Sequence, residues 1–388
     1  MKFKRIFLII LDSLGVGESL DAINYGDTGA NTLGHIKDNY DLFIPNLKKL
    51  GFLNTINMDE NDNVDAYYTI ARPNNPGKDT LNGHYEIMGV KNDIQFKSFT
   101  EKGFPRELLD QIEAITRRRV IGNKNCSGNE IIRELGERQK EFNSLIVYTS
   151  NGSNLQIAAH EDSIPVSELY DYAEKIRKIT LKEEWKIGRV IACPFTGNNS
   201  MTFKFTNERQ EYAIKPPTKS VMNFLKEKNL SVISIGKIAE VFDFEGITKV
   251  IKARSNSEGL NKLGDIMSKN FTGLCAINLN DFDNYGHKRD LDYYAKSIEE
   301  FDVEVPMILN RLETDDLLII TADHGCDPTF DGTGHTRENV PVIIYGRNLK
   351  DPKKLDILNT MADIGATIAD NFEVQKPFVG ESFLDKLK

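Results

Sequence analysis

Cysteine is scarce in this chain of 388 residues and too scattered for a disulfide framework or a thiolate metal site. The four cysteines, at positions 126, 193, 275 and 326, include no pair in CxxC spacing. Such usage suits a reducing compartment, so the sequence predicts a cytoplasmic protein.

Long apolar runs are also missing. A helix that spans a bilayer needs about 20 apolar residues, whereas the N-terminal run at residues 6–11 ends at Asp12. Basic residues precede this run, as they do in a signal peptide, but its shortness favours a first β-strand. We therefore expect no membrane partner.

The chain has no excess of positive charge. Lys and Arg number 49 against 58 Asp and Glu, which gives a net charge of −9. Binding to nucleic acid requires a basic face, so we expect no nucleic-acid partner. A small phosphorylated substrate remains compatible, because a few local basic residues are enough to hold one.

What the sequence does contain is a series of short apolar runs that alternate with helical patterns. This alternation predicts an α/β protein with a parallel sheet, helices on both faces and ligands beyond the carboxyl ends of the strands. The expected strands are 5–11, 230–236, 273–279, 316–321 and 340–346, and the clearest helical patterns are 220–229 and 292–313.

Residues 97–217 have their own set of strand and helix patterns, separate from those in the rest of the chain. They carry strand patterns at 144–150 and 186–195 and an amphipathic helical pattern at 167–180. Strands followed by acidic residues occur on both sides of this segment. We therefore expect a smaller α/β domain at 97–217, inserted into a discontinuous core made of residues 1–96 and 218–388.

Carboxylates and imidazoles gather where the expected strands end. A single Asp after a strand is more often a turn or helix-cap residue, and an isolated Asp/His pair is more often a surface pair. Here, however, three of only six histidines fall in acid-bearing, glycine-flanked segments, which favours a site for divalent metal ions. The candidate ligands are Asp12, Asp283, His287, Asp323, His324 and His335.

A nucleophile is offered by Thr80, in the segment NNPGKDTLNGHYEIMG. Metal coordination would lower the pKa of its hydroxyl and activate it. The alternative, that Thr80 merely caps a helix beginning near Leu81, is equally compatible with the spacing. For His35, in GDTGANTLGHI, we favour a helix starting at Asn31 and Thr32 over a metal-binding loop.

The motifs LIILDSLGVGESLDA, GDTGANTLGHI, GKDTLNGHYEIMG, GFPRELL, SLIVYTS, LQIAAHE, TADHGCDP and GHTRE occur in this order. Together they resemble the bacterial phosphopentomutases of the alkaline-phosphatase superfamily. The similarity extends from Met1 to the C-terminal ADIGATIADNF. Cofactor-independent phosphoglycerate mutases, of the same superfamily, are a weaker match.

The resemblance implies an alkaline-phosphatase-like core that binds two manganese ions and an inserted cap domain that covers the substrate. One ion would be held by Asp12, Asp323 and His324 with Thr80, and Thr80 matches the threonine that becomes phosphorylated. The other ion would be held by Asp283, His287 and His335.

The implied reaction interconverts the 1-phosphate and 5-phosphate of ribose or deoxyribose. It would proceed through a phosphothreonine enzyme and a bisphosphorylated sugar, which also serves as activator. A phosphohydrolase, or a mutase for another phosphosugar, is the alternative on the same core. Lys237 and basic residues of the cap would grip the phosphate that lies remote from the metal ions, and the residues implied in substrate binding are Ser150, Arg189, Arg209 and Lys237.

The expected cap departs from the family pattern in several places. Ser150 is present, but Gly152 stands where the family has an aspartate that contacts the sugar. Cys193 replaces an arginine, and Lys204 or Phe205 stands where a second phosphate-gripping arginine is expected. The metal and nucleophile set is therefore complete in the sequence, while the sugar-reading set is altered.

Overall fold

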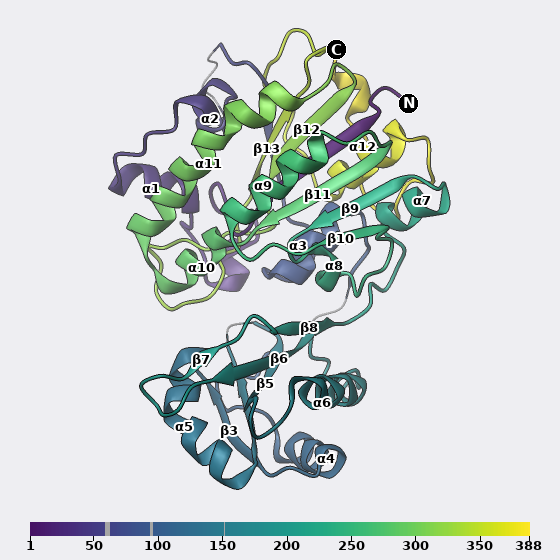
Figure 1. Cartoon of the computed structure of the whole chain (residues 1–388). Coiled ribbons are helices and arrows are strands. Elements are labelled where there is room, and N and C mark those ends of the chain that lie inside the picture. Colours follow the sequence, from purple (N-terminus) through teal and green to yellow (C-terminus); the bar gives the residue numbers. More distant parts are fainter. Residues whose placement is uncertain (59–62, 94–95, 151) are drawn as a thin grey trace. The chain divides into compact units, whose positions relative to one another are not determined.

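A computed structural model describes residues 1–58, 63–93, 96–150 and 152–388 of the chain (Figure 1). The chain forms two compact units: Met1–Ile94 with Pro216–Lys388, called the larger unit, and Gln95–Lys215, called the smaller unit. Their assignment as catalytic core and cap, with limits at residues 97 and 217, stays a prediction.

The larger unit is built around a seven-stranded sheet in the part of the chain that the structure describes. Its central strands are fully buried and rich in Ile and Leu, as parallel strands covered on both faces must be. Burial of each such side chain contributes about 1.5–3 kcal/mol. In sheet order the strands are β10 (Lys249–Ile251), β9 (Ser231–Ile235), β11 (Gly273–Leu279), β1 (Arg5–Leu11), β12 (Asp316–Thr321), β13 (Val340–Tyr345) and β2 (Tyr67–Ala71).

Three of the expected strands, 5–11, 273–279 and 316–321, coincide with β1, β11 and β12. The expectation for 340–346 was wrong in direction, because β13 pairs antiparallel with both β12 and β2. A short apolar run does not encode strand direction, and the loop from β12 to β13 returns the chain without a crossover helix. The sheet is therefore mixed but mainly parallel.

Helices cover both faces of this sheet. Figure 1 shows α9 and α11 in front of the strands, with α3 and α12 behind them. The predicted pattern at 292–313 is α11, and that at 220–229 is α7. The helices are α1 (Thr32–Asn39), α2 (Pro45–Lys49), α3 (Thr80–Ile87), α7 (Val221–Glu227), α8 (Ile238–Val241), α9 (Asn256–Met267), α10 (Asp281–Lys288), α11 (Leu291–Arg311) and α12 (Ala362–Asn371), with 3-10 turns η1 (Ala22–Tyr25), η2 (Leu53–Thr55) and η3 (Leu384–Lys386).

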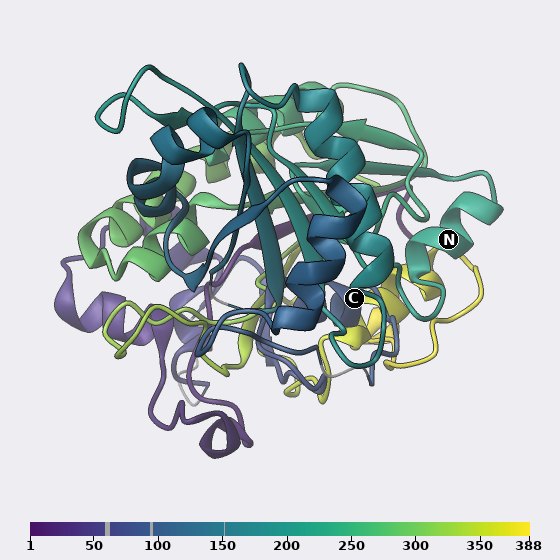
Figure 2. The same ribbon diagram turned by 90° about the horizontal axis from the view of Figure 1, so that it is seen from below.

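The smaller unit has its own mixed sheet between two layers of helices. Helix α5 packs on one face and α4 with α6 on the other, each over a separate apolar core (Figure 2). Strands β3 to β7 lie in chain order, and β8 pairs with β6. The elements are α4 (Arg106–Thr116), β3 (Val120–Asn125), α5 (Gly128–Phe142), β4 (Leu145–Thr149), β5 (Asn154–His160), α6 (Val166–Ile179), β6 (Arg189–Thr196), β7 (Lys204–Phe205) and β8 (Gln210–Ala213).

Within the described residues, none of the helices combines the length and the apolar character that a membrane crossing requires.

Candidate metal centre

Three neighbouring strands of the larger unit deliver the candidate carboxylates to one edge of the sheet. Asp12 directly follows β1, Asp323 lies two residues after β12, and Asp283 lies in α10, which begins shortly after β11. Strands β11, β1 and β12 are adjacent and parallel, so their carboxyl ends meet at the same edge. The carboxyl edge of such a sheet is where α/β proteins bind ligands.

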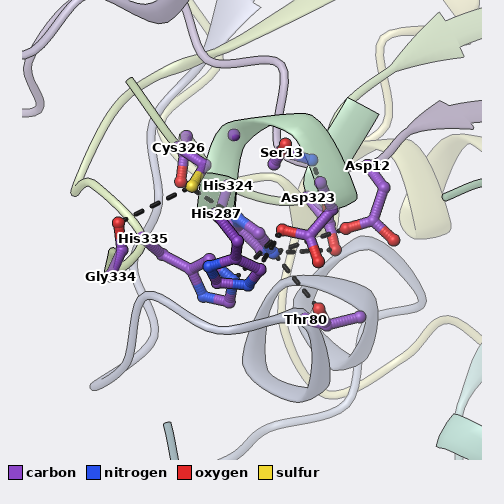
Figure 3. Close-up of polar contacts among 12 residues, drawn as sticks. Asp12, Ser13, Thr80, His287, Asp323, His324, Cys326, Gly334 and His335 are labelled. Carbon is purple, nitrogen blue, oxygen red and sulfur yellow. Dashed lines mark hydrogen bonds and ion pairs between the residues drawn. The ribbon is translucent and has the colours of Figure 1, made fainter. Parts of the chain in front are cut away.

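Asp12, Asp323 and His324 form the first candidate metal group, called the Asp12 group. All three side chains are buried, and the ligand atoms they offer lie within 4.8 Å of one another. His324 Nε2 lies 3.6 Å from Asp12 Oδ1 and 3.3 Å from Asp323 Oδ2. Figure 3 shows the two carboxylates and the imidazole directed toward a common point.

Thr80 lies beside this group, at the first residue of α3. The N-cap of the helix is Asp79, whose carboxylate accepts a hydrogen bond from the backbone N–H of Asn82. Thr80 is thus not the capping residue, which removes that alternative reading. Its hydroxyl oxygen lies 3.2 Å from His324 Nε2, at a helix N-terminus that favours negative charge (Figure 3).

Lys237 also lies at the Asp12 group, where its ammonium pairs with Asp12 Oδ2 and lies 3.4 Å from Thr80 Oγ1. The structure thus places Lys237 beside the candidate metal ligands, while its role in gripping a phosphate stays a prediction. Burial disfavours the charged form of this lysine, but the carboxylate of Asp12 outweighs it and raises the pKa of Lys237. The ammonium is held charged next to the hydroxyl of Thr80.

Asp283, His287 and His335 form the second candidate group, called the Asp283 group. Asp283 and His287 are one turn apart on α10, as their spacing predicts, and His335 enters from the glycine-rich loop before β13. Asp283 Oδ1 lies 3.2 Å from His335 Nε2 and 3.5 Å from His287 Nε2, while the two Nε2 atoms are 3.0 Å apart.

Protonation in the Asp283 group is strongly perturbed. Burial disfavours the imidazolium of His287, but the charge of Asp283 outweighs it and raises the pKa of His287 to about 11. Burial and the nearby His324 lower the pKa of His335 to about 3. Burial would raise the pKa of Asp283, but His287 and His335 hold it well below its usual value. Near neutral pH the group therefore combines a protonated His287, a neutral His335 and an ionised Asp283.

The donor set fits divalent metal ions. Each of the three aspartates has one buried carboxylate oxygen that accepts no hydrogen bond among the described residues: Asp12 Oδ1, Asp283 Oδ1 and Asp323 Oδ2. A buried carboxylate oxygen without a partner is costly, and cation binding removes that cost.

The histidines fit as well. His287 Nδ1 lies 2.6 Å from the carbonyl oxygen of Thr333, and His324 Nδ1 lies 3.1 Å from that of Gly325. A carbonyl can only accept, so Nδ1 carries the hydrogen in both rings and Nε2 faces the carboxylates. The His324 and His335 rings stack with centroids 4.0 Å apart, so the two groups are neighbours (Figure 3).

His35 lies on a helix, as predicted. Helix α1 begins at Thr32, and the Asn31 side chain accepts a hydrogen bond from Gly34 N. His35 Nδ1 lies 2.6 Å from Asp327 Oδ2, outside both candidate metal groups.

The predicted substrate residues Ser150, Arg189 and Arg209 belong to the smaller unit. Arg189 begins β6 and Arg209 precedes β8, and both pair with the buried carboxylate of Glu211, at 3.3 and 2.7 Å. Ser150 follows β4 and accepts a hydrogen bond from Gln156 Nε2 at 2.6 Å. The structure thus joins the two arginines through Glu211, a link that the sequence did not indicate.

Gly152 has a structural reason to depart from the family pattern. Its backbone φ is +86°, in the left-handed region that glycine adopts without strain. An aspartate at this position would be strained even though a Cβ would meet no atom within 4 Å. The backbone conformation at position 152 therefore favours glycine over the aspartate that the resemblance implies.

Several residues that orient the centre were missed from the sequence. Asn278 donates to Asp12 Oδ2 at 2.8 Å, and the backbone N–H of Ser13 donates to Asp323 Oδ1 at 3.0 Å. Arg337 is buried and holds the loop before Thr80, since its guanidinium donates to Asn75 O at 2.8 Å and to Asp21 Oδ1 at 3.0 Å. The arginine in GHTRE, two residues after a candidate ligand, was the signal that could have identified it.

A mainly parallel sheet with two Asp/His groups of metal-ligand type at its carboxyl edge is typical of metal-dependent α/β enzymes. The sequence profile of the Metalloenzyme superfamily matches residues 4–376, and the chain belongs to that superfamily.

Several solved structures are similar to this chain. The PH0037 protein from Pyrococcus horikoshii is similar over 98% of this chain and 100% of its own, with 14% identity and a TM-score of 0.50. Leishmania mexicana phosphoglycerate mutase matches over 98% of this chain and 97% of its own, with 13% identity and a TM-score of 0.48. A Vibrio parahaemolyticus protein of the alkaline phosphatase superfamily covers 99% of this chain and 70% of its own, with 10% identity and a TM-score of 0.46.

Proposed function

We propose that the protein is a metal-dependent phosphosugar mutase, and specifically a phosphopentomutase that interconverts the 1-phosphate and 5-phosphate of ribose or deoxyribose. The observation that carries the proposal is the place of Thr80. Its hydroxyl lies between His324 Nε2 and the ammonium of Lys237, at a helix N-terminus beside two groups of metal-ligand type. The family resemblance supplies the substrate.

In this proposal Asp12, Asp323 and His324 hold one divalent ion and Asp283, His287 and His335 the other, manganese by resemblance. Such ions neutralise charge on the phosphoryl oxygens and lower the pKa of a coordinated hydroxyl. The Thr80 oxygen attacks phosphorus, the bond from phosphorus to the sugar oxygen breaks, and Thr80 carries the phosphoryl group. Transfer of that group to the free hydroxyl of a sugar monophosphate forms the bisphosphorylated sugar, and return of its other phosphoryl group to Thr80 releases the isomer and completes the exchange.

Two features of this chain support a phosphothreonine. Thr80 is the first residue of α3, and the N-terminus of a helix stabilises negative charge. Lys237 places a largely buried ammonium 3.4 Å from the same oxygen. A bisphosphorylated sugar would serve as activator, because it loads the threonine.

Binding of the sugar phosphate is assigned to Ser150, Arg189 and Arg209, with Lys237 at the phosphoryl group being transferred. Arginine presents a planar fork that suits phosphate oxygens. Two arginines share one carboxylate at Glu211, so the cluster keeps positive charge available for a phosphate.

A second candidate is a mutase for another phosphosugar, or a phosphohydrolase, on the same core. The observation in its favour is Gly152, which removes an acid from the sugar-reading set and has a backbone conformation suited to glycine. The metal groups and Thr80 would act in the same way in either case.

A panel of sugar phosphates with manganese and a bisphosphate activator tests the proposal by following isomer formation and free phosphate together. We expect ribose or deoxyribose phosphates to isomerise faster than phosphate is released. Release of phosphate that outpaces isomerisation would favour the hydrolase, and isomerisation of only another sugar would reassign the substrate.

The variant Thr80→Ala tests the nucleophile and Thr80→Ser is its matched control. Thr80→Ala should lose transfer and form no phosphoprotein by intact mass, whereas Thr80→Ser keeps a hydroxyl at the same place and should keep measurable turnover. Near-normal turnover of Thr80→Ala would contradict the assignment.

A further inference from the structure

Helix α3, which carries Thr80, packs directly against the backbone of the metal-ligand residue Asp323. The close approach depends on Gly83, because a Cβ there would lie 2.1 Å from the carbonyl oxygen of Asp323 and 2.8 Å from its Cβ. Nothing larger than glycine fits at this contact. The position of the helix is therefore fixed relative to Asp323 at that point.

His84, the next residue, makes a polar contact at the same junction. Its ring is fully buried, and its Nδ1 lies 3.0 Å from the carbonyl oxygen of Thr80. Since a carbonyl only accepts, Nδ1 carries the hydrogen. The same nitrogen lies 3.0 Å from Asp323 Oδ2, a buried oxygen that accepts no well-aligned hydrogen bond among the described residues.

The other ring nitrogen makes no comparable contact. His84 Nε2 is buried and has no hydrogen-bond partner among the described residues. His84 also lies outside both candidate metal groups. Every polar link of the ring in this part of the chain therefore passes through Nδ1.

We propose that His84 is a positioning residue that fixes Thr80 relative to Asp323 through its Nδ1. The N–H holds the first carbonyl of α3 and directs positive potential at the carboxylate oxygen that faces the ligand position. Partners of this kind fix the orientation of a metal ligand and tune its basicity. The role of Thr80 as nucleophile rests on the proposed function, whereas the effect on metal binding does not.

Two amide variants, each of which keeps a donor at the place of one ring nitrogen, separate the two positions. In His84→Asn the amide nitrogen takes the place of Nδ1, and in His84→Gln it takes the place of Nε2. Manganese is titrated into the full-length, chelator-treated protein by calorimetry, turnover is measured with the reactive sugar phosphate, and thermal unfolding reports on the fold. We expect His84→Gln to lose about 10–100-fold in manganese affinity and kcat, with KM little changed. His84→Asn should stay close to the unchanged protein in all three.

Equal losses in the two variants, or unchanged manganese affinity in His84→Gln, would overturn the proposal. If both variants merely unfold at the same lower temperature, the role is packing and the proposal also fails. Failure of the proposed function is a separate outcome: no sugar phosphate would then react, while the difference in manganese affinity between the two variants would persist.

Discussion

The two candidate metal groups differ in how the chain holds them. The Asp12 group is anchored by residues that follow two central parallel strands, and all its side chains are buried. The Asp283 group joins a short helix to a glycine-rich loop, and its His287 side chain is 28% exposed. Strand ends are fixed by the sheet, whereas a loop depends on its local hydrogen bonds.

The difference teaches which group lies beside Thr80, the proposed nucleophile. Thr80, Lys237 and His84 all contact residues of the Asp12 group. In the Asp283 group, His287 instead contacts the carbonyl of Thr333 in the glycine-rich loop. The neighbouring Arg289 donates to the carbonyls of Gly332 and Gly334 in the same loop. Damage to the first group should therefore disable the transfer itself, and damage to the second should act mainly through metal occupancy.

The largest effect is expected from Asp323→Asn compared with Asp283→Asn. Asparagine keeps the shape of the side chain but loses the charge that holds a cation. Asp323→Asn should lower kcat about a thousandfold or more, because several kcal/mol of charge stabilisation beside Thr80 is lost. Asp283→Asn should cause a smaller loss. Turnover and metal content by elemental analysis measure both.

Each variant should retain one ion per chain if the groups are independent. If Asp283→Asn lost both ions and Asp323→Asn lost none, the Asp283 group and not the Asp12 group would be the one on which metal binding depends. Thermal unfolding of the two metal-free variants controls for misfolding.

The sequence anticipated the six candidate ligands from strand ends and helical spacing, whereas their division into the Asp12 and Asp283 groups came from the family resemblance. Asp12 directly follows an apolar run, Asp323 comes two residues after one, and Asp283 and His287 are one helical turn apart. These are local signals. The α/β sheet followed from the same runs, and the expectation of an alkaline-phosphatase-like core came from the family resemblance.

What the sequence could not supply depends on contacts between distant segments. The direction of β13, the contact of Lys237 with Asp12 and the link of Arg189 and Arg209 through Glu211 each join residues that no periodicity relates. His84 could have been noticed one turn after Thr80, but its partner Asp323 lies far along the chain. Tertiary contacts of this kind are decided by packing.

The pH dependence of metal binding should sharpen the comparison further. The pKa of His287 is raised to about 11, so its imidazole is protonated in the metal-free protein near neutral pH. A metal ion must displace that proton, so affinity at the Asp283 group should fall about tenfold for each unit of pH lowered below that value. Calorimetry in buffers of different ionisation enthalpy would measure the proton released.

The same shift affects the metal-free protein with the opposite sign. A raised pKa in the folded state stabilises it fully below the ordinary value of 6.5, and that stability is lost as pH rises toward about 11. The variant His287→Asn should abolish both the proton release and this loss of stability. Unchanged proton release in that variant would assign the proton to another residue.

The smallest effect is expected from Arg289→Gln, which tests whether the loop of the Asp283 group needs its hydrogen bonds. Arg289 donates from Nε to Gly332 O at 2.7 Å and from Nη2 to Gly334 O at 2.8 Å, next to His335. Glutamine cannot span both carbonyls, so manganese affinity at this group should fall about tenfold, while the Asp12 group stays unchanged. Arg347→Gln is the matched control, because Arg347 is exposed beyond the opposite end of β13 and donates to helix carbonyls of Leu309 and Asn310. Equal manganese affinities of the Asp283 group in the two variants would show that the loop holds His335 without Arg289. The two candidate metal groups would then not differ in their dependence on loop hydrogen bonds.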